Sequence, residues 1–331
     1  MFSEEIIFGL SQQYTAKINS IELLGASHNT VYKINCDSPF ILRLTSEHHR
    51  SKDELLGEIY FLQFLKKNGV SVAAPIPSRT NDILTEHHSA NDTVYVVAFT
   101  IADGLQWYER ADNFYFKHIG QELGRIHKAS RSYHAVNCVS RRQYTESQHL
   151  VKAATIFEKH SPALGKAFAT FMHTLSLLPK NSENFGLIHG DFLLSNYNIT
   201  EGNKVTIYDF DECEYSWFIS DIATLMYYQL TGGDPSQTAN RKDEAIEAIL
   251  KIMSGYLKEN NLPVTELKQL DLFFKLRDYV LLSMILGCGN ETLGSWDGKL
   301  VPMALDRVLN DKPFVDIDYD LIIKQLSERQ E

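Results

Sequence analysis

One segment limits the folds open to this chain more than any other, because it sets three polar side chains around two short apolar runs. Asp191 and Asn196 come before the runs 197–200 and 205–208, and Asp209 follows them. The runs are rich in β-branched and aromatic residues, and Glu-Gly-Asn-Lys joins them, which predicts a β-hairpin. Pairing the last residue of the first run with the first residue of the second sets Asn196 opposite Asp209.

These side chains supply the groups that phosphoryl transfer requires. Carboxylate and amide oxygens suit Mg²⁺, which keeps further positions for phosphate oxygens and water. A second carboxylate beside the ion, but not bound to it, can accept the proton of an attacking hydroxyl. The segment therefore indicates phosphoryl transfer, in which catalysis is mostly positioning and charge neutralisation.

The same residues match the motifs of a known family. His189-Gly190-Asp191, with Asn196 five residues after Asp191 and Asp209 in Asp-Phe-Asp, resembles the aminoglycoside phosphotransferase/choline kinase family. The motifs of that family are H-G-D-x-x-x-x-N and a D-F-[DG]-like tripeptide. The resemblance implies Asp191 as the catalytic base, Asn196 and Asp209 as ligands of Mg²⁺, and ATP as the phosphate donor.

The resemblance also implies a fold. It is α+β and protein-kinase-like, with two lobes: a mainly antiparallel β N-lobe and a helical C-lobe. We expect a nucleotide-binding N-lobe at 1–101, and at 102–331 a C-lobe with the catalytic loop and the acceptor site. Apolar patterns in the N-lobe predict strands at 21–24, 30–34, 40–44 and 94–99 and a helix at 52–67, and we expect a five-stranded sheet.

Nucleotide contacts are implied by position in this arrangement. Arg43 stands where the family has a lysine on the third strand; its guanidinium binds phosphate bidentately but is bulkier than an ammonium. Glu58 borders the apolar stripe of the helix at 52–67 and is expected to pair with Arg43, with Glu54 as the alternative. The turn after the first strand has one glycine, where a G-x-G-x-x-G loop has three. The complete set of expected contacts is Gly25, Ser27, His28, Asn29, Arg43, Glu58, Thr100 and Ala102.

Further residues are expected to support the catalytic loop. We expect His189 to hold the loop by hydrogen bonding and Asp211 either to assist a second metal or to cap a turn. Residues 217–223 resemble the family's W-x-x-x-D-[LI]-A pattern, which implies that Asp221 braces the loop, and Ser220 or Asp221 is expected to cap the helix that opens here.

One helix further along the chain carries two charges in an apolar setting. Arg277 and Asp278 lie within a strongly apolar helix predicted at 266–286. They are expected either to pair internally or to face the acceptor pocket.

Composition narrows the setting and the partners. The net charge of −10 argues against general binding of nucleic acid or of an anionic membrane. Four separated cysteines, Cys36, Cys138, Cys213 and Cys288, lack metal spacing and are expected to be reduced. The chain starts without a signal-peptide pattern and has no long apolar run, so we expect a cytoplasmic protein. The sequence does not decide whether the protein forms a homodimer.

The acceptor is expected to be a hydroxyl of a small molecule such as an amino alcohol, a sugar or an aminoglycoside. A bacterial protein Ser/Thr kinase of the same fold is the first alternative. A catalytically weak nucleotide-binding pseudokinase is the second, favoured by Arg43 and by the single glycine of the turn. A metal-dependent hydrolase using His189 and Asp191 is the third, and it lacks the further histidine ligands that it would need.

Overall fold

The computed structural model describes residues 2–89, 92–106, 115–136, 139–231, 241–287 and 297–328 of the 331. They form two compact units. Unit 1 consists of Met1–Leu105, Tyr133–Arg141 and Tyr197–Asp211, and unit 2 of Gln106–Ser132, Arg142–Asn196 and Glu212–Glu331. The expected boundary after residue 101 lies near the end of the first stretch. A single cut cannot separate the units, because Ile199 and Ile207 hydrogen-bond to the backbone of the N-terminal stretch at Leu105 and Ala73.

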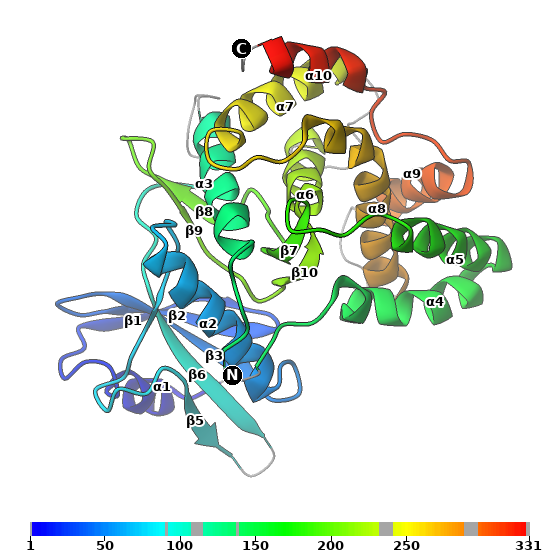
Figure 1. Cartoon of the computed structure of the whole chain (residues 1–331). Helices are drawn as coiled ribbons and strands as arrows, with labels where there is room; N and C mark the ends of the chain where they lie inside the picture. The colour runs from blue at the N-terminus through cyan, green and yellow to red at the C-terminus, as the bar shows by residue number, and fades with distance from the viewer. Residues whose placement is uncertain are drawn as a thin grey trace. The chain divides into compact units, whose positions relative to one another are not determined.

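Unit 1 is built on an antiparallel sheet of six strands in the order β1-β2-β3-β6-β4, with β5 also paired to β6 (Figure 1). The expected five strands are too few, because β5 was not predicted: its sequence Thr-Glu-His-His is polar and half exposed, so it shows no apolar alternation. The strands are β1 (Ser20–Ala26), β2 (Asn29–Asn35), β3 (Phe40–Ser46), β4 (Pro75–Ile76), β5 (Thr85–His88) and β6 (Thr93–Thr100).

Two helices accompany this sheet. Helix α2 (Lys52–Lys67) has the predicted bounds, because Ser51 and Glu54 form a capping box at its start and an apolar stripe lies along one side. Leu55, Ile59 and Leu62 of that stripe are buried. Helix α1 (Glu4–Ser11) adds its apolar residues to a separate core cluster with β2, β3 and β6.

The predicted hairpin is present in unit 1, but its register differs from the expectation by one residue. Strand β8 (Tyr197–Ile199) pairs with β9 (Val205–Ile207) so that Ile199 faces Val205. Thr200 instead closes the turn with Lys204: each N–H binds an oxygen of the other, and Asn203 takes a positive φ of 62°. The argument that the hairpin sets Asn196 opposite Asp209 is therefore wrong.

Unit 2 is mainly helical, and two short strands, β7 (Phe185–Ile188) and β10 (Glu214–Trp217), pair beside the helices. Helix α3 crosses α7 with their backbones in contact (Figure 1): a Cβ at Gly120 would lie 2.0 Å from the carbonyl oxygen of Ile252, and one at Gly255 would lie 1.9 Å from that of Lys117. The helices are α3 (Tyr115–Ser130), η2 (Tyr144–Glu146), α4 (Gln148–His160), α5 (Pro162–Ser176), α6 (Phe218–Thr231), α7 (Lys242–Tyr256), η4 (Val264–Gln269), α8 (Leu270–Gly287), α9 (Asp297–Leu309) and α10 (Tyr319–Glu328).

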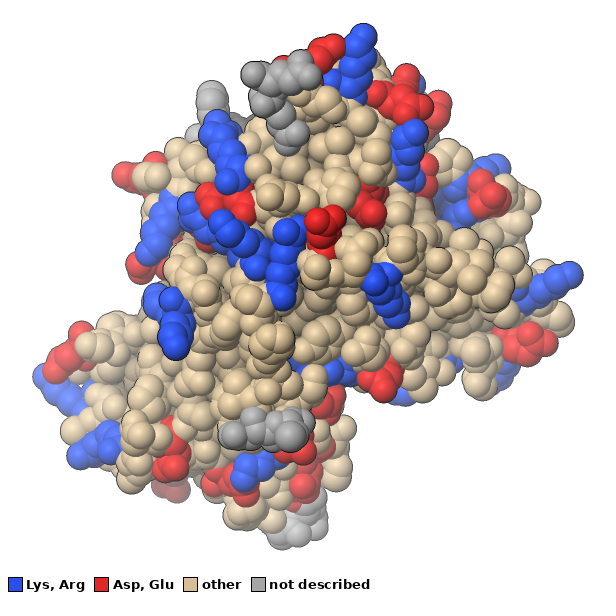
Figure 2. All heavy atoms as spheres, in the orientation of Figure 1, with Lys and Arg blue, Asp and Glu red and all other residues tan. Residues whose placement is uncertain are grey.

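The surface and the cysteines add three observations. Lys and Arg side chains gather over the part of the visible face that carries α3 (Figure 2). The charge of Lys258 lowers the pKa of Lys117, which lies within α3. Cys36 and Cys213 are buried and are not joined in a disulfide, while Cys138 and Cys288 lie outside the described residues. No helix in the described part of the chain is both long and apolar enough to cross a membrane.

Candidate active site

The loop that carries Asp191 is held by one buried carboxylate. Asp221 Oδ2 and Oδ1 accept hydrogen bonds from the backbone N–H groups of His189 at 2.8 Å and Gly190 at 2.9 Å. Helix α6 begins at Phe218, so Asp221 lies inside its first turns. The expectation that Ser220 or Asp221 caps this helix is wrong, because the side chain of Asp221 is directed to the loop.

Glycine is required in this loop. Gly190 has a φ of +81°, and a Cβ there would lie 2.2 Å from the carbonyl oxygen of Glu212. His189 is fully buried, and its Nδ1 accepts a hydrogen bond from the N–H of Asp191 at 3.3 Å.

Asp221 is in turn the end of a buried hydrogen-bond chain. Burial lowers the pKa of His127 despite the hydrogen bond with Asp221 and its charge, which favours the neutral imidazole. Asn260 donates to Tyr256 Oη at 2.7 Å, Tyr256 lies 2.9 Å from His127 Nδ1, and His127 Nε2 lies 3.2 Å from Asp221 Oδ2. One assignment of protons satisfies every member: Tyr256 donates to Nδ1, and the N–H at Nε2 donates to the carboxylate.

Two side chains of the loop are directed by contacts within unit 2. Asn196 Nδ2 donates to the carbonyl oxygen of Asp191 at 2.9 Å, and Asn196 Oδ1 accepts from Ser195 Oγ at 3.4 Å. The Asp191 carboxylate is 26% exposed and accepts from Arg277 Nη2 at 2.9 Å. Arg277 also donates to Tyr228 Oη, from Nε at 3.0 Å and from Nη2 at 2.7 Å.

The two charges of helix α8 therefore have different partners. Arg277 reaches the predicted catalytic carboxylate, so its internal pair is made at the site itself. Asp278 pairs with Arg307 and accepts from Tyr227 Oη at 2.8 Å. Burial raises the pKa of Asp278 in spite of these bonds.

In unit 1, Arg43 and Glu58 form a bidentate ion pair, with Nη1 to Oε1 at 2.9 Å and Nη2 to Oε2 at 2.6 Å. Both side chains are buried, and Glu54 is occupied by the cap of α2. Burial alone would lower the pKa of Arg43, but the charge and hydrogen bonds of Glu58, with the charges of Asp211 and Asp209, raise it above its ordinary value. Arg43 Nε is a buried donor without a hydrogen-bond partner among the described residues.

Asp211 is bound by basic side chains of its own unit. Arg50 Nε and Nη2 each donate to its carboxylate at 3.2 Å, and His49 Nε2 lies 3.1 Å away. Burial would raise the pKa of Asp211, but the hydrogen bond with His49 and the charges of Arg43 and Arg50 hold it well below its usual range. Arg141 also donates to the Asp211 carbonyl at 2.6 Å. These contacts fit a structural role, and assistance to a second metal stays a prediction.

Asp209 has a strained backbone. Its φ is 65°, in the left-handed region that residues other than glycine rarely occupy, and such strain concentrates at functional sites. Asp209 belongs to unit 1, whereas Asp191 and Asn196 belong to unit 2. A shared metal ion at Asn196 and Asp209 therefore stays a prediction.

The remaining predicted nucleotide contacts lie in unit 1. The turn between β1 and β2 is short, and the Ser27 N–H already donates to the Asn29 carbonyl at 3.1 Å. Asn29 Oδ1 accepts from Thr45 at 2.7 Å, and the ring of His28 stacks on His49. Gly25 lies within β1 and not in the turn.

Two further predicted contacts lie after the last long strand of the sheet. At the expected adenine segment, the Thr100 N–H donates to Ala74 at 2.9 Å, and the Ala102 carbonyl accepts from Asn198 at 2.9 Å. The Ala102 N–H makes no hydrogen bond to any other described residue.

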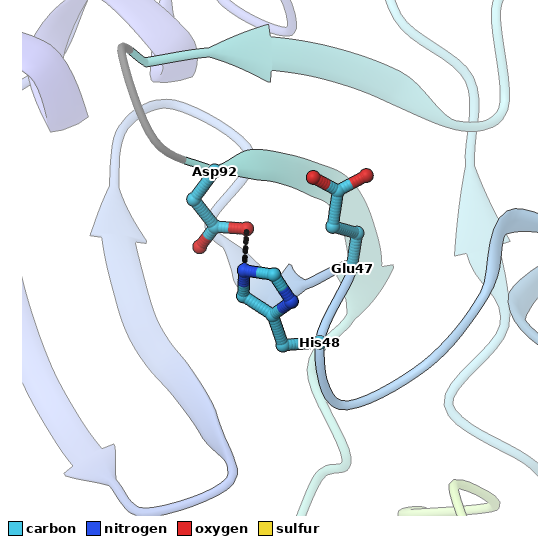
Figure 3. Close-up of side chains that lie close together, drawn as sticks. All are labelled: Glu47, His48 and Asp92. Carbon is cyan, nitrogen blue, oxygen red and sulfur yellow. Dashed lines mark ion pairs between the residues drawn. The ribbon is translucent and has the colours of Figure 1, made fainter.

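A separate group of metal-type donors is exposed. Figure 3 shows Glu47, His48 and Asp92, whose ligand atoms lie within 4.8 Å of one another. Glu47 already accepts from the N–H of Thr93 at 3.1 Å, and Asp92 accepts from Ser46 Oγ at 3.0 Å. These bonds between the turn after β3 and the start of β6 account for the grouping.

Several residues of these networks were not predicted from the sequence. Tyr228, His49 and Arg50 carry no local pattern that points to Asp191 or Asp211; Arg50 and Asp211 are 161 positions apart. The run His48-His49-Arg50 just before α2 was the available signal, because a buried cation beside a helix start requires an anionic partner.

Together, a sheet unit with a buried Arg–Glu pair and a helical unit with a braced carboxylate loop define a phosphotransferase of the kinase-like class. The sequence profile of the family described as "Phosphotransferase enzyme family" matches residues 21–253. The chain belongs to this family.

Individual relatives agree over nearly the whole chain. Amicoumacin kinase of Bacillus subtilis (strain 168) is 25% identical over 328 residues, which cover 97% of this chain and 96% of the relative. A solved structure of an amicoumacin kinase in complex with AMP-PNP, Ca²⁺ and Ami has a TM-score of 0.88 and 21% identity, covering 97% of both chains. A microcompartment-associated aminopropanol kinase has a TM-score of 0.75 and 20% identity, covering 93% of this chain and 98% of that one.

These comparisons settle two expectations. The expected α+β protein-kinase-like fold is confirmed by the solved structures. The expected enzyme class, a phosphotransferase that acts on an alcohol group of a small molecule, is confirmed by the family and the full-length relative.

Proposed function

We propose that the protein transfers the γ-phosphoryl group of ATP to a hydroxyl of a small molecule in a Mg²⁺-dependent reaction. Asp191 accepts or orients the proton of the acceptor hydroxyl. Arg43, held by Glu58, steadies the α- and β-phosphates. Asn196 and Asp209 hold Mg²⁺, which when bound neutralises phosphate charge.

The observation that carries this proposal is the arrangement of the Asp191–Asn196 loop. One N–H of the Asn196 amide donates to the Asp191 carbonyl, which fixes the amide orientation. Among the described residues, the amide oxygen accepts only a long hydrogen bond of 3.4 Å from Ser195 Oγ, so it keeps a lone pair for a hard cation. The backbone N–H groups of His189 and Gly190 bind the buried Asp221. These bonds hold the loop, and therefore the Asp191 carboxylate that follows, in one position.

The chain also has donors that suit a nucleotide. The unpartnered Nε of Arg43 can donate to a phosphate oxygen without breaking the pair with Glu58. The N–H of Ala102, two residues after Thr100 in the predicted adenine segment, is a donor without a hydrogen bond to another described residue. Relatives agree in kind: one was solved with AMP-PNP and Ca²⁺, and the relatives named above are an amicoumacin kinase and an aminopropanol kinase.

The test is nucleotide-dependent transfer in Asp209→Asn, with Asp103→Asn as the control, because Asp103 is an exposed carboxylate of the same unit. Release of ADP is measured with a panel of amino alcohols, polyols, sugars and aminoglycosides, in Mg²⁺, Mn²⁺ or Ca²⁺. We expect Asp209→Asn to lower kcat by about a hundredfold or more and to remove the rise in Tm that Mg-ATP gives the wild type. Transfer by Asp209→Asn within about tenfold of the control would exclude Asp209 as a metal ligand.

A further inference from the structure

The predicted catalytic carboxylate is not alone on its side of unit 2. Arg277 of α8 donates one N–H to Asp191, and Tyr228 of α6 accepts two more from the same guanidinium. An arginine has five N–H groups, so the two on Nη1 remain. They make no hydrogen bond to any residue in the described part of the chain, so Nη1 is able to donate to a ligand.

The shape of a guanidinium shows where a further partner fits. Its side edge is formed by Nε and Nη2, and its end edge by Nη1 and Nη2. Tyr228 Oη accepts from both nitrogens of the side edge. Asp191 Oδ1 takes the second N–H of Nη2, which half-fills the end edge. An oxygen bound to Nη1 would therefore lie next to the Asp191 carboxylate.

This guanidinium is fixed before any ligand arrives. The Arg277 side chain is 13% exposed, and its central carbon lies 4.9 Å from the centre of the Tyr228 ring. Asp191, Arg277 and Tyr228 come from the loop and from two helices of one unit, so no element has to move to assemble them. A donor held in this way selects partners by position, because little side-chain entropy is lost on binding.

The charges around Asp191 favour one kind of acceptor. The Arg277 guanidinium neutralises Asp191, so the carboxylate attracts an ammonium group less than an unpaired carboxylate would. Burial first, and then the charges of Arg277 and Arg142, lower the pKa of the nearby His149 against the opposing charges of Glu212 and Asp191. The lowered pKa favours the neutral imidazole, which adds no attraction for a cation.

We propose that Arg277 determines acceptor specificity. Its Nη1 binds an oxygen on the carbon adjacent to the one that bears the reacting hydroxyl, whose proton Asp191 accepts or orients. The acceptor is then a vicinal diol or a 2-hydroxy amide or acid, in preference to a simple amino alcohol. This inference rests on the proposed function, because it assigns the acceptor hydroxyl to Asp191.

The test uses acceptors that share one three-carbon skeleton and differ in the group beside the secondary hydroxyl. They are 1,2-propanediol, lactamide, lactate and 1-amino-2-propanol. Each acceptor is tested at up to molar concentration in the presence of Mg-ATP. The proteins are the wild type, Arg277→Met, Arg277→Lys and the control Lys275→Met, which removes a cation of the same helix whose partner is the exposed Asp311. The kcat and KM of each pair are measured, with the Tm rise on Mg-ATP addition as a check on folding.

We expect the wild type and Lys275→Met to have a kcat/KM at least about tenfold higher for an acceptor with an oxygen beside the secondary hydroxyl than for 1-amino-2-propanol. Arg277→Met should lose that preference or reverse it, mainly through KM. Arg277→Lys keeps the charge but loses the planar, forked set of N–H donors, so it should keep a kcat near that of the wild type and still lose the preference. This variant carries the test if Arg277→Met does not fold.

Two results would overturn the inference. A wild type that prefers 1-amino-2-propanol, or a preference unchanged in Arg277→Met and Arg277→Lys, excludes Arg277 as the specificity residue and leaves the proposed function intact. No transfer by the wild type to these acceptors or to the wider panel counts against the proposed function and the inference together.

Discussion

Replacement of Asp221 by asparagine tests the support of the catalytic loop. The carboxylate accepts hydrogen bonds at 2.8 and 2.9 Å from two backbone N–H groups and lies 3.2 Å from His127 Nε2. Each hydrogen bond to a charged group is worth about 1.5–3 kcal/mol. Asparagine keeps one accepting oxygen, but its NH₂ group then faces a buried N–H group. We therefore expect the free energy of unfolding to fall by about 3–5 kcal/mol.

The measurement is urea unfolding followed by far-UV circular dichroism, with each transition fitted separately because the chain has two units. Asp320→Asn is the control: that carboxylate is 81% exposed and pairs with Lys268, so its loss should cost less than about 1 kcal/mol. In the folded fraction of Asp221→Asn, kcat should fall by about a hundredfold, because the loop shifts. A loss of stability below about 1 kcal/mol, or full activity, would refute the assignment of Asp221 as the brace.

Two further predictions concern the same loop. Since burial lowers the folded-state pKa of His127 below that of the unfolded chain, stability falls as pH drops below about 6.5, by up to about 1.4 kcal/mol per pH unit. His127→Gln should lack this part of the slope in urea unfolding between about pH 6.5 and 5, and equal slopes would show that folding does not lower the pKa of His127. Gly190→Ala should destabilise by at least about 2 kcal/mol, because φ is +81° and a Cβ would lie 2.2 Å from Glu212, whereas Gly202→Ala, whose Cβ would approach no atom closer than 3.8 Å, should be near neutral in the same assay.

Local patterns in the sequence predicted helix and strand positions where they carry their own signals. Helix α2 was placed correctly because its start has a capping box and its buried face has an apolar stripe. Strand β5 was not predicted, because Thr-Glu-His-His gains its structure from pairing with β6 and has no apolar face of its own. The hairpin register was off by one because the Thr200 hydroxyl and the left-handed Asn203 close a turn that composition does not specify.

The candidate site shows the same limit. The family resemblance placed Arg43, and helix periodicity placed Glu58 beside the apolar stripe with Glu54 as the alternative; the structure has the pair of Arg43 with Glu58. The contact of Arg277 with Asp191 joins positions 86 residues apart and depends on how α8 packs in unit 2. The sequence could state only that a charge inside an apolar helix needs a partner. The identity of that partner follows from tertiary packing alone.

The crossing of α3 and α7 has a consequence for how this enzyme tolerates change. Helices that meet through side chains can accommodate a mutation by repacking those side chains. Here glycines bring main chain against main chain, so there is no space for an added side chain. Because α3 also carries His127, which contacts Asp221, a methyl group added at this helix crossing should displace α3 and with it the contact to Asp221. Substitutions far from the reacting atoms, at Gly120 or Gly255, should thus appear in genetic screens as loss of catalysis.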